Sequence, residues 1–307
     1  MYDIPILFII FKRYDTTLKV FNKIRSIKPQ KLYIAADAPR FEAEKEKCLQ
    51  TRSIVDNIDW DCDVKLLYHD KNLGCKYGPY TAINWFFQYE KEGIILEDDC
   101  LPNDSFFVFM REMLHTYRDD NRIGMIAGHN PINVEVPSSY IFSRFKGCWG
   151  WATWKRAWKN IDIELTNLNY TDEIIPLMVY DKKREIHWKH ALKSISENKV
   201  AAWDWPWYFS LAAENQLCIF PHKNLVANIG FGEEGTHCFG NPEENTLTTY
   251  ELNFPLNKPN NIAPNLTFEY AFEKELNMGR NSLRKRIVGL VPKNIRIYIK
   301  TILRKYI

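Results

Sequence analysis

Three adjacent acidic residues follow a short apolar run in the segment GIILEDDCLPNDSFF, which spans residues 93–107. Glu97, Asp98 and Asp99 repel one another, and the repulsion grows where a strand end removes them from water. Such a cluster therefore needs a positive partner. Mg²⁺ and Mn²⁺ are typically held by one or two carboxylates. The triplet predicts a site for a hard divalent cation; the alternative is an acidic turn that faces water and caps a helix beginning near Ser105.

Four apolar runs of strand length occur in the first hundred residues, at 4–11, 32–36, 64–68 and 94–96. Each precedes a stretch that suits a helix: one with its N-cap at Asp15, and others over 41–55, 80–89 and 105–117. Strands that alternate with helices predict the α/β class, with a mostly parallel sheet flanked by helices. In such sheets ligands bind beyond the carboxyl ends of the strands.

The residues that follow the four strands should therefore share one crevice. Arg13 follows the first strand, Asp37 the second, the loop HDKNLGCKYG (69–78) the third, and the acid triplet the fourth. Acids beside a basic loop suit a metal that bridges the protein and a diphosphate. No GxGxxG follows any of these four strands and GxxxxGK[ST] does not occur, which counts against dinucleotide and P-loop sites. As alternatives, Arg13 would form only a surface ion pair and Asp37 would cap the turn before Pro39.

Composition narrows the class of protein further. With 307 residues and 46% hydrophobic content, the chain can bury a large core, so disorder is excluded. Seven cysteines without a CxxC pair predict a reducing cytosol, and zinc is not expected. The apolar run near the start is too short to cross a membrane, and no positive stretch precedes it, so export is not expected. No nucleic-acid partner is expected.

Several segments together resemble nucleotide-sugar glycosyltransferases of the GT-A fold, most closely the N-acetylglucosaminyltransferase I group and its bacterial relatives. They are IPILFIIFKRYDTTLKVF, LYIAAD, GIILEDDCLPNDSFFVFM, FKGCWGW, AAWDWPW and NIGFGEEGTH, in this order between about residues 4 and 240. The resemblance implies a Rossmann-like GT-A sheet, a UDP-sugar donor such as UDP-N-acetylglucosamine, and Mn²⁺ or Mg²⁺ as cofactor. It also implies inverting transfer to a glycan or lipid-linked glycan in surface polysaccharide synthesis.

In that family the acid triplet is the DxD-type motif, and its residue roles carry over by position. The resemblance implies that Asp99 binds the metal while Glu97 and Asp98 face the donor. The remaining donor-side assignments are Arg13 to the nucleotide, Asp37 to the uracil base, Lys76 to the neighbourhood of the diphosphate and His237 to the metal. The loop GFGEEGTH (230–237) could close over the donor as a lid.

The acceptor side is expected in the tryptophan-rich segments 145–158 and 201–209, which hold seven of the ten tryptophans. By resemblance, Asp204 in WDW is the base that removes the acceptor proton. This sequence has a tryptophan where the family has a second acid after that position. As an alternative, Asp204 is the N-cap of a helix whose Pro206 lies just inside. The tryptophans expected to stack on sugar rings, unless they belong to the core, are Trp149, Trp151 and Trp203.

The predicted organisation is a nucleotide-sugar-binding half (1–130), an acceptor half of the same domain (131–265) and a basic tail (266–307). Residues 280–307 hold nine Lys or Arg and no acid. Isoleucines on one helical face and basic residues on another suit an anionic membrane surface; the alternative is a helix packed on the acidic body. A cytoplasmic protein is expected, with the tail as a peripheral attachment to the inner face of the plasma membrane.

Two other functions stay open from the sequence. A sugar-nucleotidyltransferase has a related sheet, but it would usually show a glycine-rich N-terminal motif, which FIIFKRYDTT lacks. A non-catalytic carbohydrate-binding protein would need the tryptophans but neither Asp99 nor Asp204. Such a protein should also be indifferent to a chelator.

Overall fold

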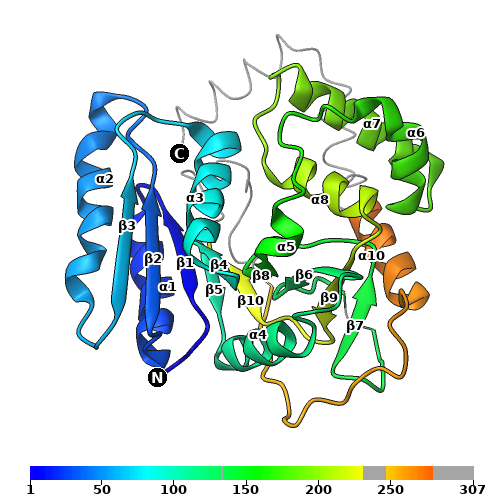
Figure 1. The fold of residues 1–307 in the computed structure, drawn as a ribbon, viewed down its shortest axis with the longest axis horizontal. Coiled ribbons are helices and arrows are strands. Elements are labelled where there is room, and N and C mark those ends of the chain that lie inside the picture. Colours follow the sequence, from blue (N-terminus) through cyan, green and yellow to red (C-terminus); the bar gives the residue numbers. More distant parts are fainter. Residues whose placement is uncertain (133, 231–246, 279–307) are drawn as a thin grey trace, which may run out of the picture.

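The computed structural model describes residues 1–132, 134–230 and 247–278 (Figure 1). The strands are β1 (Ile6–Ile10), β2 (Lys31–Ala36), β3 (Asp63–Tyr68), β4 (Glu92–Glu97), β5 (Cys100–Pro102), β6 (Ile123–Ala127), β7 (Tyr140–Ser143), β8 (Trp151–Trp154), β9 (Leu217–Pro221) and β10 (Val226–Asn228). The α-helices are α1 (Tyr14–Ile27), α2 (Lys45–Arg52), α3 (Gly74–Tyr89), α4 (Asp104–Thr116), α5 (Lys155–Trp158), α6 (Thr171–Ile174), α7 (Lys182–Ser196), α8 (Asp204–Ala213) and α10 (Leu266–Met278).

An eight-stranded sheet runs in the order β3-β2-β1-β4-β8-β6-β9-β7, which confirms the predicted α/β class. The first four strands in this order are parallel, and β8 runs antiparallel between β4 and β6. From β1 the chain builds β2 and β3 on one side and then returns to place β4 on the other side. The strand order therefore reverses between β1 and β4. Ligands bind open α/β sheets in the crevice at such a point.

The sheet is covered on both faces, and this explains why its central strands read as continuous apolar runs. Side chains alternate between faces along a strand, so Ile6 and Phe8 of β1 join one core cluster while Leu7 joins the other. Helices α1 and α4 contribute to the first cluster, and α3, α5, α7, α8 and α10 contribute to the second. Two well-packed layers of helices fix the positions of the carboxyl ends of the strands relative to one another.

Helix boundaries differ from the sequence-based predictions at several points. Helix α1 begins at Tyr14, so the residue at its N-cap position is Arg13 and Asp15 lies in the first turn. The predicted helix over 41–55 is α2 flanked by two short 3₁₀ turns. Helix α4 follows the prediction closely, and the side chain of Asn103 caps it by accepting from the Phe106 N–H at 3.1 Å. The acid triplet therefore does not cap α4.

Three strands after residue 120, β6, β7 and β8, were not predicted from the sequence. Each has only four or five residues, and β8 is the tryptophan-rich WATW. Since β4 pairs with β8, the two predicted halves share one continuous sheet.

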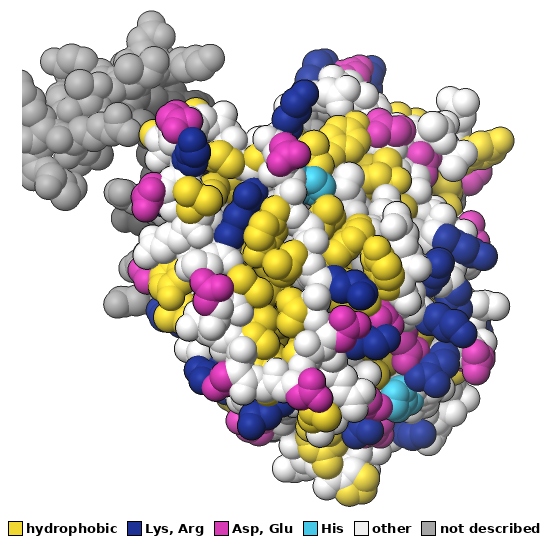
Figure 2. All heavy atoms as spheres, turned by 60° about the vertical axis from the view of Figure 1, so that its left-hand side comes forward, with side chains coloured by type: hydrophobic (Ala, Val, Ile, Leu, Met, Phe, Trp, Pro, Cys, Tyr) yellow, Lys and Arg dark blue, Asp and Glu magenta, His cyan; other side chains and the backbone are white. Residues whose placement is uncertain are grey.

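The two edges of the sheet differ in how they are protected. Strand β3 lies at one edge, where Leu66 is exposed and Asp63 and Lys65 place charges beside it. Figure 2 shows hydrophobic side chains gathered in the middle of the molecule's face on this side, with charged side chains around them. Charged residues on an edge strand discourage pairing with another sheet. At the other edge, β7 is covered by α10, and the Asn265 N–H donates to the Phe142 carbonyl at 2.9 Å.

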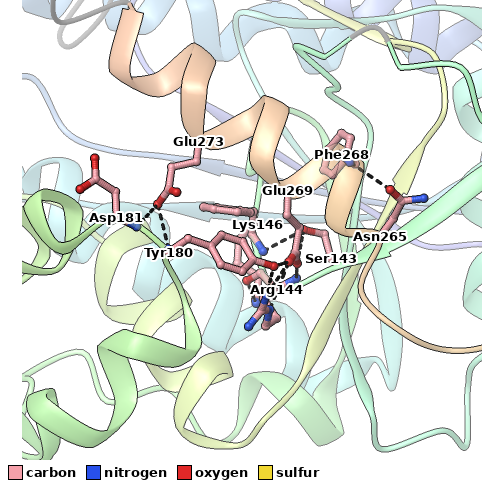
Figure 3. Close-up of polar contacts among 10 residues, drawn as sticks. Ser143, Arg144, Lys146, Tyr180, Asp181, Asn265, Phe268, Glu269 and Glu273 are labelled. Carbon is pink, nitrogen blue, oxygen red and sulfur yellow. Dashed lines mark hydrogen bonds and ion pairs between the residues drawn. The ribbon is translucent and has the colours of Figure 1, made fainter.

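Helix α10 is fastened to the body by two buried carboxylates (Figure 3), although residues 266–278 were assigned to the basic tail from the sequence. Glu269 has no exposed surface; it pairs with Arg144 at 2.8 Å and accepts from the Ser143 hydroxyl at 3.0 Å. Glu273 accepts from the backbone N–H of Tyr180 at 3.0 Å. These bonds join α10 to β7 and to the segment that leads into α7.

We expect Glu269→Ala to lower the free energy of unfolding by about 3 to 5 kcal/mol, because it leaves the partly buried Arg144 without its partner. Urea unfolding measures this loss. Glu275→Ala is the matched control, because Glu275 lies on the same helix with an exposed side chain, and its effect should stay within about 0.5 kcal/mol. Equal effects of the two substitutions would contradict the assignment of Glu269 as a structural anchor.

Candidate active site

Arg13 and the acid triplet meet where the strand order reverses. Arg13 directly precedes α1 after β1, and Asp98 and Asp99 form the turn that joins β4 to β5. One guanidinium nitrogen of Arg13 contacts both carboxylates: it hydrogen-bonds to Asp98 and lies 2.8 Å from Oδ2 of Asp99. Burial opposes the charge of Arg13, but the two aspartates outweigh it and raise the pKa of the guanidinium. The positive partner that the triplet requires is therefore Arg13.

One arginine does not balance all the negative charge at this point. Burial raises the pKa of Glu97 to about 8, with further contributions from the charges of Asp99, Asp98 and Asp204. Burial also raises the pKa of Asp98 to about 6, although Arg13 acts in the opposite direction. The Oδ2 atom of Asp98 is buried and has no hydrogen-bond partner in the described part of the chain. The site therefore holds an excess of carboxylate that a further cation would stabilise.

This excess predicts a measurable pH dependence of stability. A carboxyl with a folded pKa of about 8 and an ordinary value of 4.5 binds more protons in the folded than in the unfolded state between these pH values. Its contribution to stability is complete below pH 4.5 and is lost as the pH rises through 8. With chelator present, we expect Glu97→Gln to raise the free energy of unfolding at pH 8 by roughly 1 to 3 kcal/mol and to have less effect at pH 5.

Thermal unfolding at the two pH values checks this expectation. Glu46→Gln on α2 serves as the control, because Glu46 is exposed and lies outside the acid triplet. A Glu97→Gln variant that is no more stable than the control at pH 8 would show that burial and the neighbouring carboxylates do not destabilise the charged form of Glu97.

The carboxylates of this site can provide some of the ligands of a hard divalent cation. Asp99 is half-buried and Asp98 has a buried oxygen without a partner, and carboxylate oxygens are the ligands that such cations prefer. The described residues contain no group of three His, Cys, Asp or Glu arranged to hold a metal ion. The protein would therefore supply one or two carboxylates, and waters and phosphate oxygens would supply the rest. His237, the other predicted ligand, lies outside the described residues.

Strand β10 brings a second chain segment against Asp99. It pairs antiparallel with β5, and the Ile229 N–H donates to the Asp99 carbonyl at 2.8 Å. A Cβ atom on Gly230 would lie 2.2 Å from Oδ2 of Asp99 and 2.6 Å from Nη1 of Arg13, so a larger residue there would displace this pair. From residue 231 onward, the predicted lid GFGEEGTH lies outside the described residues.

Asp37 follows β2 and accepts backbone hydrogen bonds at the start of α3. Its two oxygens accept from the N–H groups of Leu73 and Gly74 at 2.9 to 3.0 Å, and one accepts from Ala38 at 2.8 Å. Helix α3 therefore begins at Gly74, six residues before the predicted start, and Gly74 has a φ of 70° that favours glycine. The contact of Asp37 with a nucleotide base stays a prediction.

Lys76 lies in the first turn of α3 and is buried. Its Nζ is 3.4 Å from Oε2 of Glu164 and 4.9 Å from the centre of the Tyr77 ring. A role near a diphosphate stays a prediction, because these contacts show Lys76 paired with Glu164.

Asp204 reaches the acid cluster from the second half of the chain. It is the first residue of α8 and is half-buried; Trp203, not Asp204, occupies the N-cap position. Asp204 is close enough to Glu97 to raise the pKa of that carboxyl. The Cys75 thiol in the first turn of α3 donates to the Ala201 carbonyl at 3.1 Å, which ties the segment before Asp204 to the edge of the crevice. The structure therefore brings the predicted base to the predicted donor site.

Three residues around Asp204 were missed from the sequence. Cys75 and Cys148 both have pKa values raised by burial and, further, by the charges of Asp204 and Glu97. Burial raises the pKa of Tyr208 as well, with further contributions from Cys148 and Asp204. Tyr208 follows Asp204 by one helical turn, so the i, i+4 spacing of α8 could have identified it.

The three predicted sugar-stacking tryptophans differ in exposure. Trp151 has no exposed surface and lies in β8, with its ring stacked 5.5 Å from that of Trp203, which is also buried. In this structure no sugar can reach Trp151, because the rings of Trp158, Trp203 and Trp207 pack against it on one face of the sheet. Trp149 is half-buried beside His129, with ring centres 4.5 Å apart. Of the three, Trp149 keeps the exposure that a sugar contact requires.

Two further sequence-based expectations concern membranes and cysteines. No helix in the described part of the chain is long and apolar enough to span a membrane. The basic segment 280–307 lies outside the described residues. Six cysteines within the described ranges are free thiols.

Comparison with known proteins gives no family assignment. No protein-family model matches the chain, and no curated protein matches it. Among solved structures, HddC from Yersinia pseudotuberculosis is 11% identical, with a TM-score of 0.30 over 51% of this chain and 78% of HddC. Apo UDP-glucose pyrophosphorylase is 10% identical, with a TM-score of 0.36 over 73% of this chain and 93% of that one.

A third similar structure is 4-diphosphocytidyl-2C-methyl-D-erythritol synthase from Anaerococcus prevotii, 7% identical, with a TM-score of 0.31 over 64% of this chain and 84% of the synthase. HddC was also solved with GMP-PN, and UDP-glucose pyrophosphorylase with UDP-glucose. Overlays with such low TM-scores carry no argument about residue roles or activity. None of these three structures is named as an N-acetylglucosaminyltransferase.

Proposed function

We propose that this protein is an enzyme that binds a nucleotide sugar where β1 and β4 end and transfers the sugar to a glycan or lipid-linked glycan acceptor. One observation carries the proposal: Arg13, the acid triplet and Asp204 converge at the reversal point of the sheet from three separate parts of the chain. A structural turn would not require a carboxylate from α8 beside three others, since like charges repel.

Each residue then has a chemical task in an inverting transfer. Asp204 accepts the proton of the acceptor hydroxyl while the new bond forms between that oxygen and the anomeric carbon. The bond from the anomeric carbon to the diphosphate breaks, and the leaving group departs with the electron pair. Arg13 stands beside the acids to contact the nucleotide phosphates. Mn²⁺ or Mg²⁺ held by Asp99, with Glu97 and Asp98 toward the donor, would stabilise the charge on the leaving diphosphate.

The second candidate is a sugar-nucleotidyltransferase, and the names of the structural neighbours match it better than they match a glycosyltransferase. Such an enzyme would join a nucleoside triphosphate to a sugar phosphate and release pyrophosphate. The position of Asp204 favours glycosyl transfer, because an acceptor hydroxyl needs a base and a phosphate nucleophile does not.

A melting-temperature panel with UDP, GDP, CDP and dTDP, each with Mn²⁺ or with EDTA, tests the shared donor site. A ligand at about 100 times its Kd stabilises the folded state by roughly 2.7 kcal/mol. We expect one diphosphate, UDP, to raise the melting temperature with Mn²⁺ and not with EDTA. No shift with any nucleotide would contradict the proposal. Product analysis then separates the two candidates: release of UDP from a UDP-sugar supports glycosyl transfer, and pyrophosphate from UTP and a sugar 1-phosphate supports nucleotidyl transfer.

A further inference from the structure

A cavity of about 350 Å³ lies between α7 and the start of α8. Its wall on α7 is a stripe at helical spacing, formed by His187, His190, Ser194 and Ile195. Trp205 of α8 forms the opposite wall. Cavities of this size are in the range of small-ligand sites in proteins.

The indole of Trp205 is held in a fixed orientation. The His187 ring meets it edge-on with centres 5.5 Å apart, and the Trp188 ring lies 4.2 Å away on the neighbouring position of α7. Trp205 remains half-buried, so part of its surface faces the cavity. A rigid aromatic surface loses little conformational entropy when a ligand stacks on it.

The cavity adjoins the proposed base. Trp205 and Asp204 are consecutive residues, so their Cα atoms lie about 3.8 Å apart across the peptide bond. The turn that closes the cavity is also fixed, because the Val200 N–H donates to the Ser194 carbonyl at 3.2 Å and Cys75 holds the Ala201 carbonyl. The cavity therefore begins one residue along α8 from the proposed base.

We infer that this cavity binds a sugar residue of the acceptor, with the pyranose ring stacked on Trp205 and its hydroxyls within reach of the imidazole of His190. An aromatic surface suits the C–H face of a sugar, and imidazole nitrogens can donate or accept hydrogen bonds. The lysines nearby already have acidic partners, as in the pair of Lys189 with Asp172, which disfavours a site built for a phosphate. The inference rests on the proposed function, because it identifies the sugar as part of the acceptor.

Fluorine NMR of the full chain labelled with 5-fluorotryptophan tests this inference, with Trp205→Phe used to assign the Trp205 resonance. The probes are methyl glycosides of glucose, galactose, mannose and N-acetylglucosamine at about 100 mM, a concentration that suits millimolar affinities. We expect at least one glycoside to shift the Trp205 resonance. A shift caused only by hexanol would overturn the inference in favour of an apolar group, and no shift with any glycoside would also overturn it.

Variants then connect the shift to the proposed contacts. Saturation-transfer NMR should show the dissociation constant of the responding glycoside rising about tenfold in Trp205→Ala and His190→Ala. Trp60→Phe is the matched control, because Trp60 is a half-buried tryptophan of the first half, and it should leave the dissociation constant unchanged. An equal loss in the control would overturn the assignment of the site to Trp205.

The two proposals fail in distinguishable ways. If the glycoside binds at Trp205 but no nucleotide raises the melting temperature, the sugar site stands and the transferase proposal falls, leaving a carbohydrate-binding protein. If a nucleotide binds with Mn²⁺ but no glycoside reaches Trp205, the donor site stands and the acceptor cavity is wrong. Asp204→Asn should preserve the glycoside shift, because the sugar contacts lie on Trp205 and α7.

Discussion

Asp99→Ala is expected to abolish the chelator-sensitive stabilisation of this protein by a nucleoside diphosphate. Without that carboxylate the site loses its proposed metal ligand, and the diphosphate would then face Glu97 and Asp98 with only Arg13 to oppose their charge. The roughly 2.7 kcal/mol given by a ligand at about 100 times its Kd should fall to near zero. Differential scanning fluorimetry with UDP and Mn²⁺ measures this directly.

The same variant carries an internal check on folding. Asp99→Ala removes one of four neighbouring carboxylates, so the melting temperature without ligand should stay equal or rise. Asp104→Asn is the control, because Asp104 begins α4 with a side chain that is 77% exposed, and it should keep the full response to ligand. Undiminished, chelator-sensitive stabilisation of Asp99→Ala would refute the metal assignment.

Asp204→Asn should lower the rate of sugar transfer by about a hundredfold or more while leaving the binding of the donor nearly unchanged. The amide has almost the same shape as the carboxylate but cannot accept the acceptor's proton. Initial rates of UDP release with acceptor present give the loss in kcat, and the nucleotide-induced melting shift reports on the donor site in the same preparation.

Two comparisons make the result specific to the base. Asp172→Asn changes a carboxylate of the same half whose side chain is 77% exposed, so its turnover should equal that of the wild type. Glu97→Gln leaves Asp204 in place, so it should retain transfer better than Asp204→Asn does. Near-normal turnover of Asp204→Asn would remove Asp204 from the mechanism and leave Glu97 as the next carboxylate to test.

The first four strands could be predicted from the sequence because burial on both faces leaves an unbroken apolar run in each. The rule that parallel strands end at one edge then placed Arg13 beside the acid triplet, and Arg13 contacts Asp98 and Asp99 in the structure. The contact of Arg13 with Asp98 and Asp99 follows from this rule once β1 and β4 are neighbours.

Strands β6, β7 and β8 escaped prediction, because short strands give too few residues for a period to emerge. Because β8 was not predicted, the sequence also gave no indication that Trp151 lies in a strand. A tryptophan in a loop can contact a sugar, whereas the ring of Trp151 is covered by those of Trp158, Trp203 and Trp207. Local sequence does not distinguish these cases, because two of the covering rings, those of Trp203 and Trp207, come from a distant part of the chain.

The sequence by itself determined the class of sheet and the edge at which the candidate site lies, because strand periodicity and chain direction are local properties. Only the tertiary structure decided which carboxylates lie close enough to interact electrostatically. The pKa of Glu97 depends on burial and on Asp204, more than a hundred residues away along the chain. The structure also showed that Asp37 accepts a hydrogen bond at the start of α3 and that a cavity lies beside Trp205. Electrostatic and packing energies depend on distance in space, which residue spacing along the chain does not specify.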